Sequence, residues 1–205
     1  MTINSRPLSL RTSSELPWRD LCGMLCCMFA IASAGCNQST NAPAGSTSGG
    51  GGFTMSLDGF TLQFSDEWQK SPAIPGNPAV GAMLGRTPQE AMENGATFVA
   101  LAPPIPSGSD ASNLMGLVRK PTDNEFMKTE QDKDIEISGM SGFFQVVRTF
   151  GNPNAPENLR EDTLQHKWTL SSGNRIIQIA GQCRASKAPE FAPKFEEVVQ
   201  TLKFQ

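Results

Sequence analysis

A short apolar segment near the N-terminus constrains this chain more than any other feature. Residues 21–34 are apolar or small without interruption, and three arginines precede them. These 14 residues are too few for a membrane-spanning helix, which needs about 20. A basic flank, a short apolar core and small residues after it are typical of a secretory signal peptide. The sequence therefore predicts that residues 1–35 are an export signal, and Glu15 and Asp20 in the flank leave open a later start codon.

The end of this segment resembles the lipobox of bacterial lipoproteins. Residues 32–36 read ASAGC, and in that family small residues precede a cysteine that is diacylated and becomes the new N-terminus. The resemblance implies lipidation of Cys36 and attachment to a bacterial membrane, where two or more acyl chains give a stable anchor. Ser33 departs from the pattern, since the family usually has leucine there. Because Ala32-Ser33-Ala34 also fits an ordinary signal-peptidase site, cleavage after Ala34 without lipidation stays an alternative.

A polar spacer follows Cys36. Residues 37–52 have no large apolar side chain, so they cannot bury enough surface to offset the entropy lost on ordering. A Gly/Ser-rich chain behaves as a random coil, and these 16 residues would span about 20–25 Å. We therefore expect a flexible tether over residues 36–52, with the domain facing the periplasm. In the enteric sorting rule, aspartate after the acylated cysteine retains a lipoprotein in the inner membrane, so Asn37 favours the outer membrane.

Residues 53–205 have the size of one domain with a substantial core. They hold 14 basic and 18 acidic side chains, which gives a formal charge of −4. A mildly acidic domain, in which positive and negative side chains are interspersed, offers no electrostatic basis for binding nucleic acid. The expected partners are instead the membrane, through the lipid anchor, and another protein of the cell envelope.

Cysteine usage argues against redox and metal chemistry in this domain. Cys22, Cys26 and Cys27 lie inside the export signal, so their CxxxCC spacing is not interpreted as a metal motif. With Cys36 acylated, only Cys183 remains and no internal disulfide can form. Without acylation, a Cys36–Cys183 bridge or a bridge between two copies becomes conceivable. We expect no cofactor and no metal.

Apolar periodicity predicts an antiparallel β-rich domain that ends in a helix. The clearest hairpins are 53–57 with 60–64 around Asp58-Gly59, and 162–170 with 175–183 around a Ser-Ser-Gly-Asn turn. Further strands are expected at 80–85, 97–102, 133–138 and 141–150, and helical segments at 65–68, 89–94, 110–120 and 122–128. A last helix is expected from Pro193, with its apolar face made by Phe195, Val198, Val199 and Leu202. The expected fold class is α+β, an antiparallel β-sheet flanked by helices.

The layout resembles the PsbP-like superfamily, which includes bacterial DcrB-type lipoproteins. The residues that carry the resemblance are Phe60, Leu62, Phe64 and Trp68 near the start of the domain, and segment 175–204 with its Phe195-x-x-x-Val199-x-x-Leu202-x-Phe204 ending. The resemblance spans most of residues 53–205. It implies an α/β/α sandwich used for binding or assembly, generally without catalysis, and it assigns no functional residue.

His166 is the single histidine of the chain. It lies on a strand face whose other residues are apolar, which favours a packed, hydrogen-bonded core histidine over a catalytic one. No G-x-S-x-G motif supplies an activated serine, and one histidine cannot build a zinc site of several imidazoles. Cys183 ends a strand beside Arg184, a cation that could lower its pKa, but a structural thiol is favoured.

Asp132, Asp134 and Glu136 alternate along the chain and could bridge a hard cation. They lack the loop glycine and the distant glutamate of an EF-hand, so a solvated turn and strand edge is favoured. Together these observations predict a lipid-anchored envelope protein whose domain binds or helps to assemble another component and is not an enzyme. The alternatives are a periplasmic hydrolase that uses His166 with an acidic partner, and a carrier with a small-ligand pocket between sheet and helices.

Overall fold

Two hairpins form where the sequence predicts them. Strand β1 (Phe53–Leu57) turns through Asp58-Gly59 into β2 (Phe60–Phe64), with Leu57 opposite Phe60. Gly59 lies at φ +92°, a conformation that glycine adopts without steric cost. The later hairpin joins β8 (Thr163–Ser172) to β9 (Arg175–Arg184) in antiparallel register.

The computed structural model describes residues 51–72, 79–121, 123–154, 160–173 and 175–204, all within a unit that spans residues 42–205. The remaining strands are β3 (Trp68–Lys70), β4 (Val80–Leu84), β5 (Thr97–Leu101), β6 (Met127–Ile137), β7 (Met140–Thr149) and β10 (Lys203–Phe204). The helices are α2 (Pro88–Asn94), α3 (Ala111–Arg119), a short 3-10 helix η2 (Ala185–Lys187) and α4 (Ala188–Gln200). None of these described helices combines the length and the apolar character that crossing a membrane requires.

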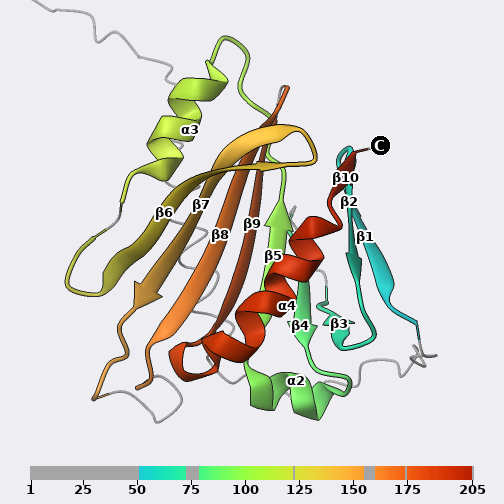
Figure 1. Ribbon diagram of the computed structural model, residues 1–205, viewed down its shortest axis with the longest axis vertical. Helices are drawn as coiled ribbons and strands as arrows, with labels where there is room; N and C mark the ends of the chain where they lie inside the picture. Colours follow the sequence, from blue (N-terminus) through green and yellow to red (C-terminus); the bar gives the residue numbers. More distant parts are fainter. Residues whose placement is uncertain (1–50, 73–78, 122, 155–159, 174, 205) are drawn as a thin grey trace, which may run out of the picture. The chain divides into compact units, whose positions relative to one another are not determined.

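The strands form two antiparallel sheets (Figure 1). The large sheet has seven strands in the order β3-β4-β5-β9-β8-β7-β6, so β6 lies at one edge. The small sheet has the order β1-β2-β10. Helix α4 crosses the large sheet over β8 and β9 and also contacts β2 of the small sheet. This arrangement confirms the predicted α+β class, with an antiparallel sheet and helices packed on it.

Successive side chains of β7 point to opposite faces of the large sheet. The Phe144 ring lies beside Trp168 and His166, on the face that α4 covers. The next side chain, Gln145, points the other way and donates a 2.8 Å hydrogen bond to the carbonyl of Arg119, the last residue of α3. Helices therefore lie on both faces of the sheet, as the expected sandwich requires.

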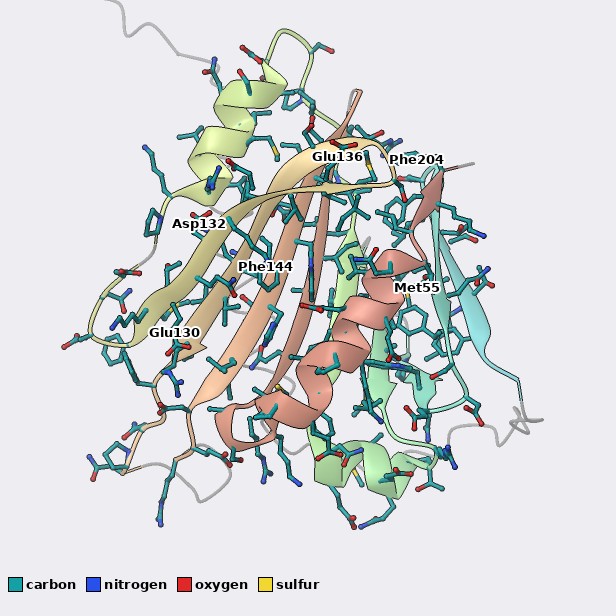
Figure 2. All side chains as sticks on the ribbon, viewed as in Figure 1. Met55, Glu130, Asp132, Glu136, Phe144 and Phe204 are labelled. Atoms are coloured by element: carbon teal, nitrogen blue, oxygen red, sulfur yellow. The ribbon has the colours of Figure 1, made fainter. Side chains whose placement is uncertain are left out.

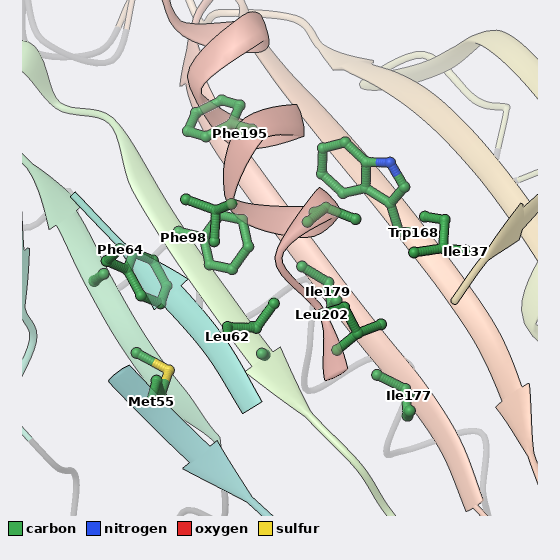
Figure 3. Close-up of a cluster of buried hydrophobic side chains, with 14 of the residues drawn as sticks. Met55, Leu62, Phe64, Phe98, Ile137, Trp168, Ile177, Ile179, Phe195 and Leu202 are labelled. Carbon is green, nitrogen blue, oxygen red and sulfur yellow. The ribbon is translucent and has the colours of Figure 1, made fainter. Parts of the chain in front are cut away.

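The core fills the space between α4 and the two sheets (Figure 3). Trp68, Phe98 and Phe195 form its aromatic centre, with ring centroids 5.9 to 6.4 Å apart. Gly181 of β9 lies directly beneath Phe195, and a Cβ there would come within 2.5 Å of the ring. Glycine at this position therefore lets α4 approach the sheet closely.

The helix expected over residues 122–128 is wrong. Thr122 lies outside the described residues, and Met127 already belongs to β6. The Asn124 side chain accepts hydrogen bonds from the backbone N–H groups of Phe126 (2.8 Å) and Met127 (2.9 Å). Side-chain acceptors that take nearby N–H groups compete with a helix. β6 instead pairs with β7 along its length, which extends the strand expected at 133–138 back to Met127.

Two further local predictions need correction. The segment 65–68 is a turn closed by a 3.2 Å bond from the Trp68 N–H to the Ser65 carbonyl, and Trp68 begins β3 because it pairs with Leu84 of β4. The last helix begins at Ala188, so Pro189 occupies the first turn and Pro193 lies inside the helix. Pro193 cannot donate a hydrogen bond to the carbonyl of Pro189, and its ring crowds that carbonyl, which is the usual cost of proline inside a helix.

Candidate functional site

The predicted lipidation site, Cys36, lies outside the described residues, which begin at residue 51. The candidates that the structure places are His166, Cys183 and the carboxylates of β6.

His166 lies on the face of β8 that α4 covers and is 8 % exposed. Its ring centroid is 5.9 Å from that of Phe195, 6.0 Å from Phe144 and 6.3 Å from Trp168. Neither Nδ1 nor Nε2 has a hydrogen-bond partner among the described residues. Burial lowers the pKa of His166 below its ordinary value of 6.5, because the apolar surroundings disfavour the charged form.

The expected packing of His166 is therefore confirmed, but the expected hydrogen bond is missing from the described part of the chain. The neighbouring positions explain this, because His166 is paired with Val146 on β7 and Gly181 on β9. Phe195 covers it from α4. The structure brings no described carboxylate into hydrogen-bonding contact with this imidazole, which is the contact that the hydrolase alternative needs.

Cys183 is also a core residue, at 1 % exposure. Burial, with a smaller contribution from the charge of Glu161, raises the pKa of the thiol to about 12. Arg184 follows Cys183 on the strand, so its side chain points to the other face, and its Nε lies 4.0 Å from the Glu161 carboxylate. The thiol stays protonated at neutral pH, which agrees with the predicted structural role.

Two of the three alternating carboxylates of β6, Asp132 and Asp134, bind an arginine (Figure 2 labels Asp132 on this strand). Asp132 accepts a 2.9 Å hydrogen bond from Nε of Arg119, and Asp134 accepts one from Nη1. The bond from Arg119 holds the pKa of Asp132 below its usual range. These contacts tie the end of α3 to the edge strand. The described residues contain no group of three or more side chains placed to hold a metal ion.

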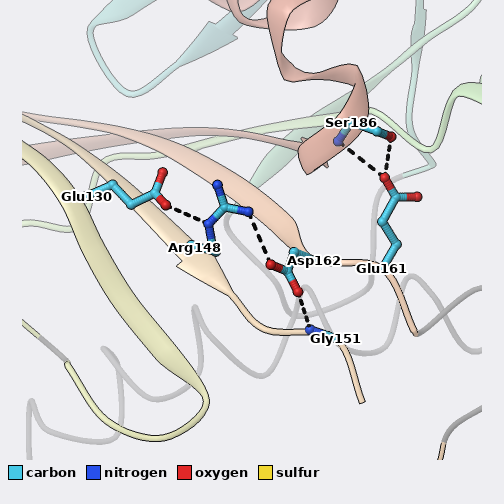
Figure 4. Close-up of polar contacts among 6 residues, drawn as sticks. All are labelled: Glu130, Arg148, Gly151, Glu161, Asp162 and Ser186. Atoms are coloured by element: carbon cyan, nitrogen blue, oxygen red, sulfur yellow. Dashed lines mark hydrogen bonds and ion pairs between the residues drawn. The ribbon is translucent and has the colours of Figure 1, made fainter. Parts of the chain in front are cut away.

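A second charged network joins β6 and β7 to the start of β8 (Figure 4). The Arg148 guanidinium donates to Glu130 and, at 3.1 Å, to Asp162. Asp162 also accepts the backbone N–H of Gly151 at 2.8 Å, and this bond is the main cause of its lowered pKa. Sequence reasoning missed this network because its members lie far apart in the chain and meet only once the strand register is set.

A hollow of about 230 Å³ lies beside α4, bordered by β6, by Phe144 and Trp168, and by Glu196 and Gln200. Both aromatic rings are buried, and the Lys133 ammonium lies 5.0 Å from the centre of the Phe144 ring. The chain's own cation thus occupies the aromatic face, and little apolar surface is left for a small ligand. A larger hollow, of about 390 Å³, has no ionisable side chain in its lining, which is made by Ile105, Pro106, Ser107, Ser109, Ala111 and Gly173. Neither hollow gives the carrier alternative a specific set of ligand-binding groups.

No protein-family model matches this chain, and no curated protein matches it significantly. Solved structures do resemble it. LpqN of Mycobacterium tuberculosis, described as involved in cell envelope biogenesis, is 11 % identical with a TM-score of 0.55, over 71 % of this chain and 83 % of LpqN. At this identity the likeness shows a shared fold only.

Two other solved structures resemble the chain more distantly. Cyanobacterial PsbP from Synechocystis sp. PCC 6803 is 13 % identical with a TM-score of 0.49, over 80 % of this chain and 100 % of PsbP. A protein of Bacteroides thetaiotaomicron is 13 % identical with a TM-score of 0.46, over 71 % of this chain. The chain spans only 45 % of the length of that protein.

Proposed function

We propose that this chain is a lipid-anchored envelope protein whose domain binds or helps to assemble another envelope component and catalyses no reaction. The ASAGC segment that ends at Cys36 supports the anchor, and residues 37–52 have the composition of a tether. Export places the domain in the periplasm, and Asn37 favours the outer membrane. The same fold in LpqN, a protein described as involved in cell envelope biogenesis, fits this role.

The observation that carries the binding role is the position of the two most reactive side chains. Within the core, His166 is held neutral and has no hydrogen-bond partner among the described residues, and Cys183 is held protonated. Proton transfer and nucleophilic attack both require the group to reach a substrate. Apolar side chains on the surface of the described domain, in contrast, can reach a partner, and where they lie together they can form a binding surface.

Lipidation gives the first testable prediction. Cells grown with radiolabelled palmitate are expected to label this protein, and Cys36→Ala is expected to abolish the label because it removes the acyl acceptor. The same change should release the protein from the membrane fraction, since no acyl chain then holds it.

The matched control is Cys27→Ala, which removes a cysteine from the apolar export segment and should keep the label. Palmitate incorporation that persists in Cys36→Ala, or that is lost equally in Cys27→Ala, would contradict the assignment of the anchor to Cys36.

A further inference from the structure

Two phenylalanines stand exposed side by side at the open end of β6 and β7. Phe126 is 64 % exposed and Phe150 is 41 % exposed. The Phe150 N–H donates a 2.9 Å bond to the Phe126 carbonyl, which continues the register by one pair beyond Met127 and Thr149. Directly opposed residues of an antiparallel pair have Cβ atoms about 4.5–5.5 Å apart and point to the same face. Phe126 and Phe150 are therefore exposed apolar neighbours at this end of the sheet.

The turn before β6 holds Phe126 in a fixed position. Asn124 accepts the N–H groups of Phe126 and Met127 through its side chain, and its own N–H donates to the Met127 carbonyl at 2.9 Å. Asp123 accepts the Thr129 N–H at 2.7 Å. An aromatic side chain on a segment that is already ordered loses little conformational entropy when it binds.

Carboxylates lie near the two phenylalanines. The bond from Thr129 lowers the pKa of Asp123, which therefore stays charged, and Glu125 is exposed without an ion pair among the described residues. On the Phe150 side, Glu130 and Asp162 share the single guanidinium of Arg148 (Figure 4).

Residues 123–130 and the ion-pair network of Arg148 together hold four carboxylates (Asp123, Glu125, Glu130 and Asp162) and two cations, Lys128 and Arg148. The excess of negative charge attracts a cationic partner and opposes an anionic lipid surface.

The edge of the sheet itself is poorly suited to receive an added strand. A register shift between Thr129 and Gln131 interrupts β6, and its exposed side chains are mostly charged. Bulges and charges on an edge strand both oppose pairing with another chain. A partner that binds at this end of the sheet is therefore recognised through side chains and not through strand pairing.

We propose that Phe126 and Phe150, with the carboxylates around them, form the docking surface for a partner protein, called here the Phe126 patch. It takes a segment in which an apolar side chain lies next to lysine or arginine. The apolar group covers the two rings, and the cation meets Glu125 and Asp123. This inference rests on the proposed binding function and names its surface and the chemistry of its partner.

Photo-crosslinking of the full chain in cells tests the proposal. With p-benzoylphenylalanine in place of Phe126, we expect a discrete adduct with another protein. Phe150→Ala and Glu125→Lys should each reduce the adduct, by about tenfold if each removes roughly 1.4 kcal/mol of binding free energy. Leu117→Ala, which truncates an exposed apolar residue on α3, and Glu197→Lys, which reverses an exposed charge on α4, should leave it unchanged.

Other outcomes overturn the inference in distinguishable ways. Adducts with lipid alone would show a membrane contact, and adducts with a second copy of this chain would show self-association. An adduct that is insensitive to Glu125→Lys would refute the cationic partner. Adducts from Met92 or Leu117 but not from position 126 would move the surface elsewhere and leave the binding function standing. No protein adduct from any of these positions would overturn the binding function as well.

Discussion

Replacing Phe195 with alanine is expected to lower the free energy of unfolding by about 3–5 kcal/mol, the usual cost of deleting a buried aromatic side chain. Phe195 is 0 % exposed and contacts Trp68, Phe98 and His166 from the centre of α4. Its loss leaves a cavity between the helix and the large sheet, where the surrounding rigid rings cannot easily collapse. Urea unfolding of the full chain, followed by tryptophan fluorescence, measures the change.

The matched control is Phe126→Ala, the same substitution at an exposed position, which should change stability by no more than about 0.5 kcal/mol. Gly181→Ala should cost about 1–3 kcal/mol, because the new methyl group collides with the Phe195 ring. That cost should largely disappear when Phe195 is already alanine. A loss below about 1 kcal/mol for Phe195→Ala would contradict the central position of this ring in the core.

Mild acidification is expected to destabilise the protein through His166. The pKa of this residue is near 6.5 in the unfolded chain and lower in the folded protein, where burial disfavours its charged form. Between these two values the unfolded chain binds a proton that the folded protein does not. Stability is therefore fully present above pH 6.5 and falls as the pH drops below it, by up to about 1.4 kcal/mol per pH unit.

The variant His166→Phe separates this effect from other titrations. It should reduce the loss of stability between pH 7.5 and pH 5.5 by about 1 kcal/mol, because it removes the group that titrates in this range. Glu67 and Asp132 have pKa values below their ordinary 4.5 and 3.8, so they lose their contribution only at lower pH. Equal pH dependence in the wild-type protein and in His166→Phe would contradict a neutral, buried His166.

The parts of the fold that followed from sequence are those in which local chemistry and tertiary pairing agree. Asp58-Gly59 suits a tight turn, and the strands on either side of it alternate cleanly. The segment from Thr122 to Lys128 shows the opposite case. A capping-box spacing predicts a helix there, but the side chains of Asp123 and Asn124 bind the backbone of the following residues, and pairing with β7 then extends the strand.

Some of the candidate sites could likewise be predicted from the sequence, and others could not. The burial of His166 and Cys183 was predictable, because both lie on strand faces whose neighbours are apolar. The Phe126 patch was not, because it depends on the register between β6 and β7 and on a turn whose sequence predicts a helix. The residue type alone does not tell whether a phenylalanine is exposed or buried. The pairing of the strand that carries it decides this.

Recognition of a cationic partner can be measured by an affinity titration of the full chain, purified from membranes in detergent. Two synthetic peptides serve as probes, one with phenylalanine between lysines and one with phenylalanine between glutamates. The lysine peptide is expected to bind about tenfold tighter or more, to weaken with added salt, and to lose its advantage in Glu125→Lys but not in Glu197→Lys. Equal affinity for the two peptides, or the same response to both charge reversals, would contradict recognition of a cationic partner at the Phe126 patch.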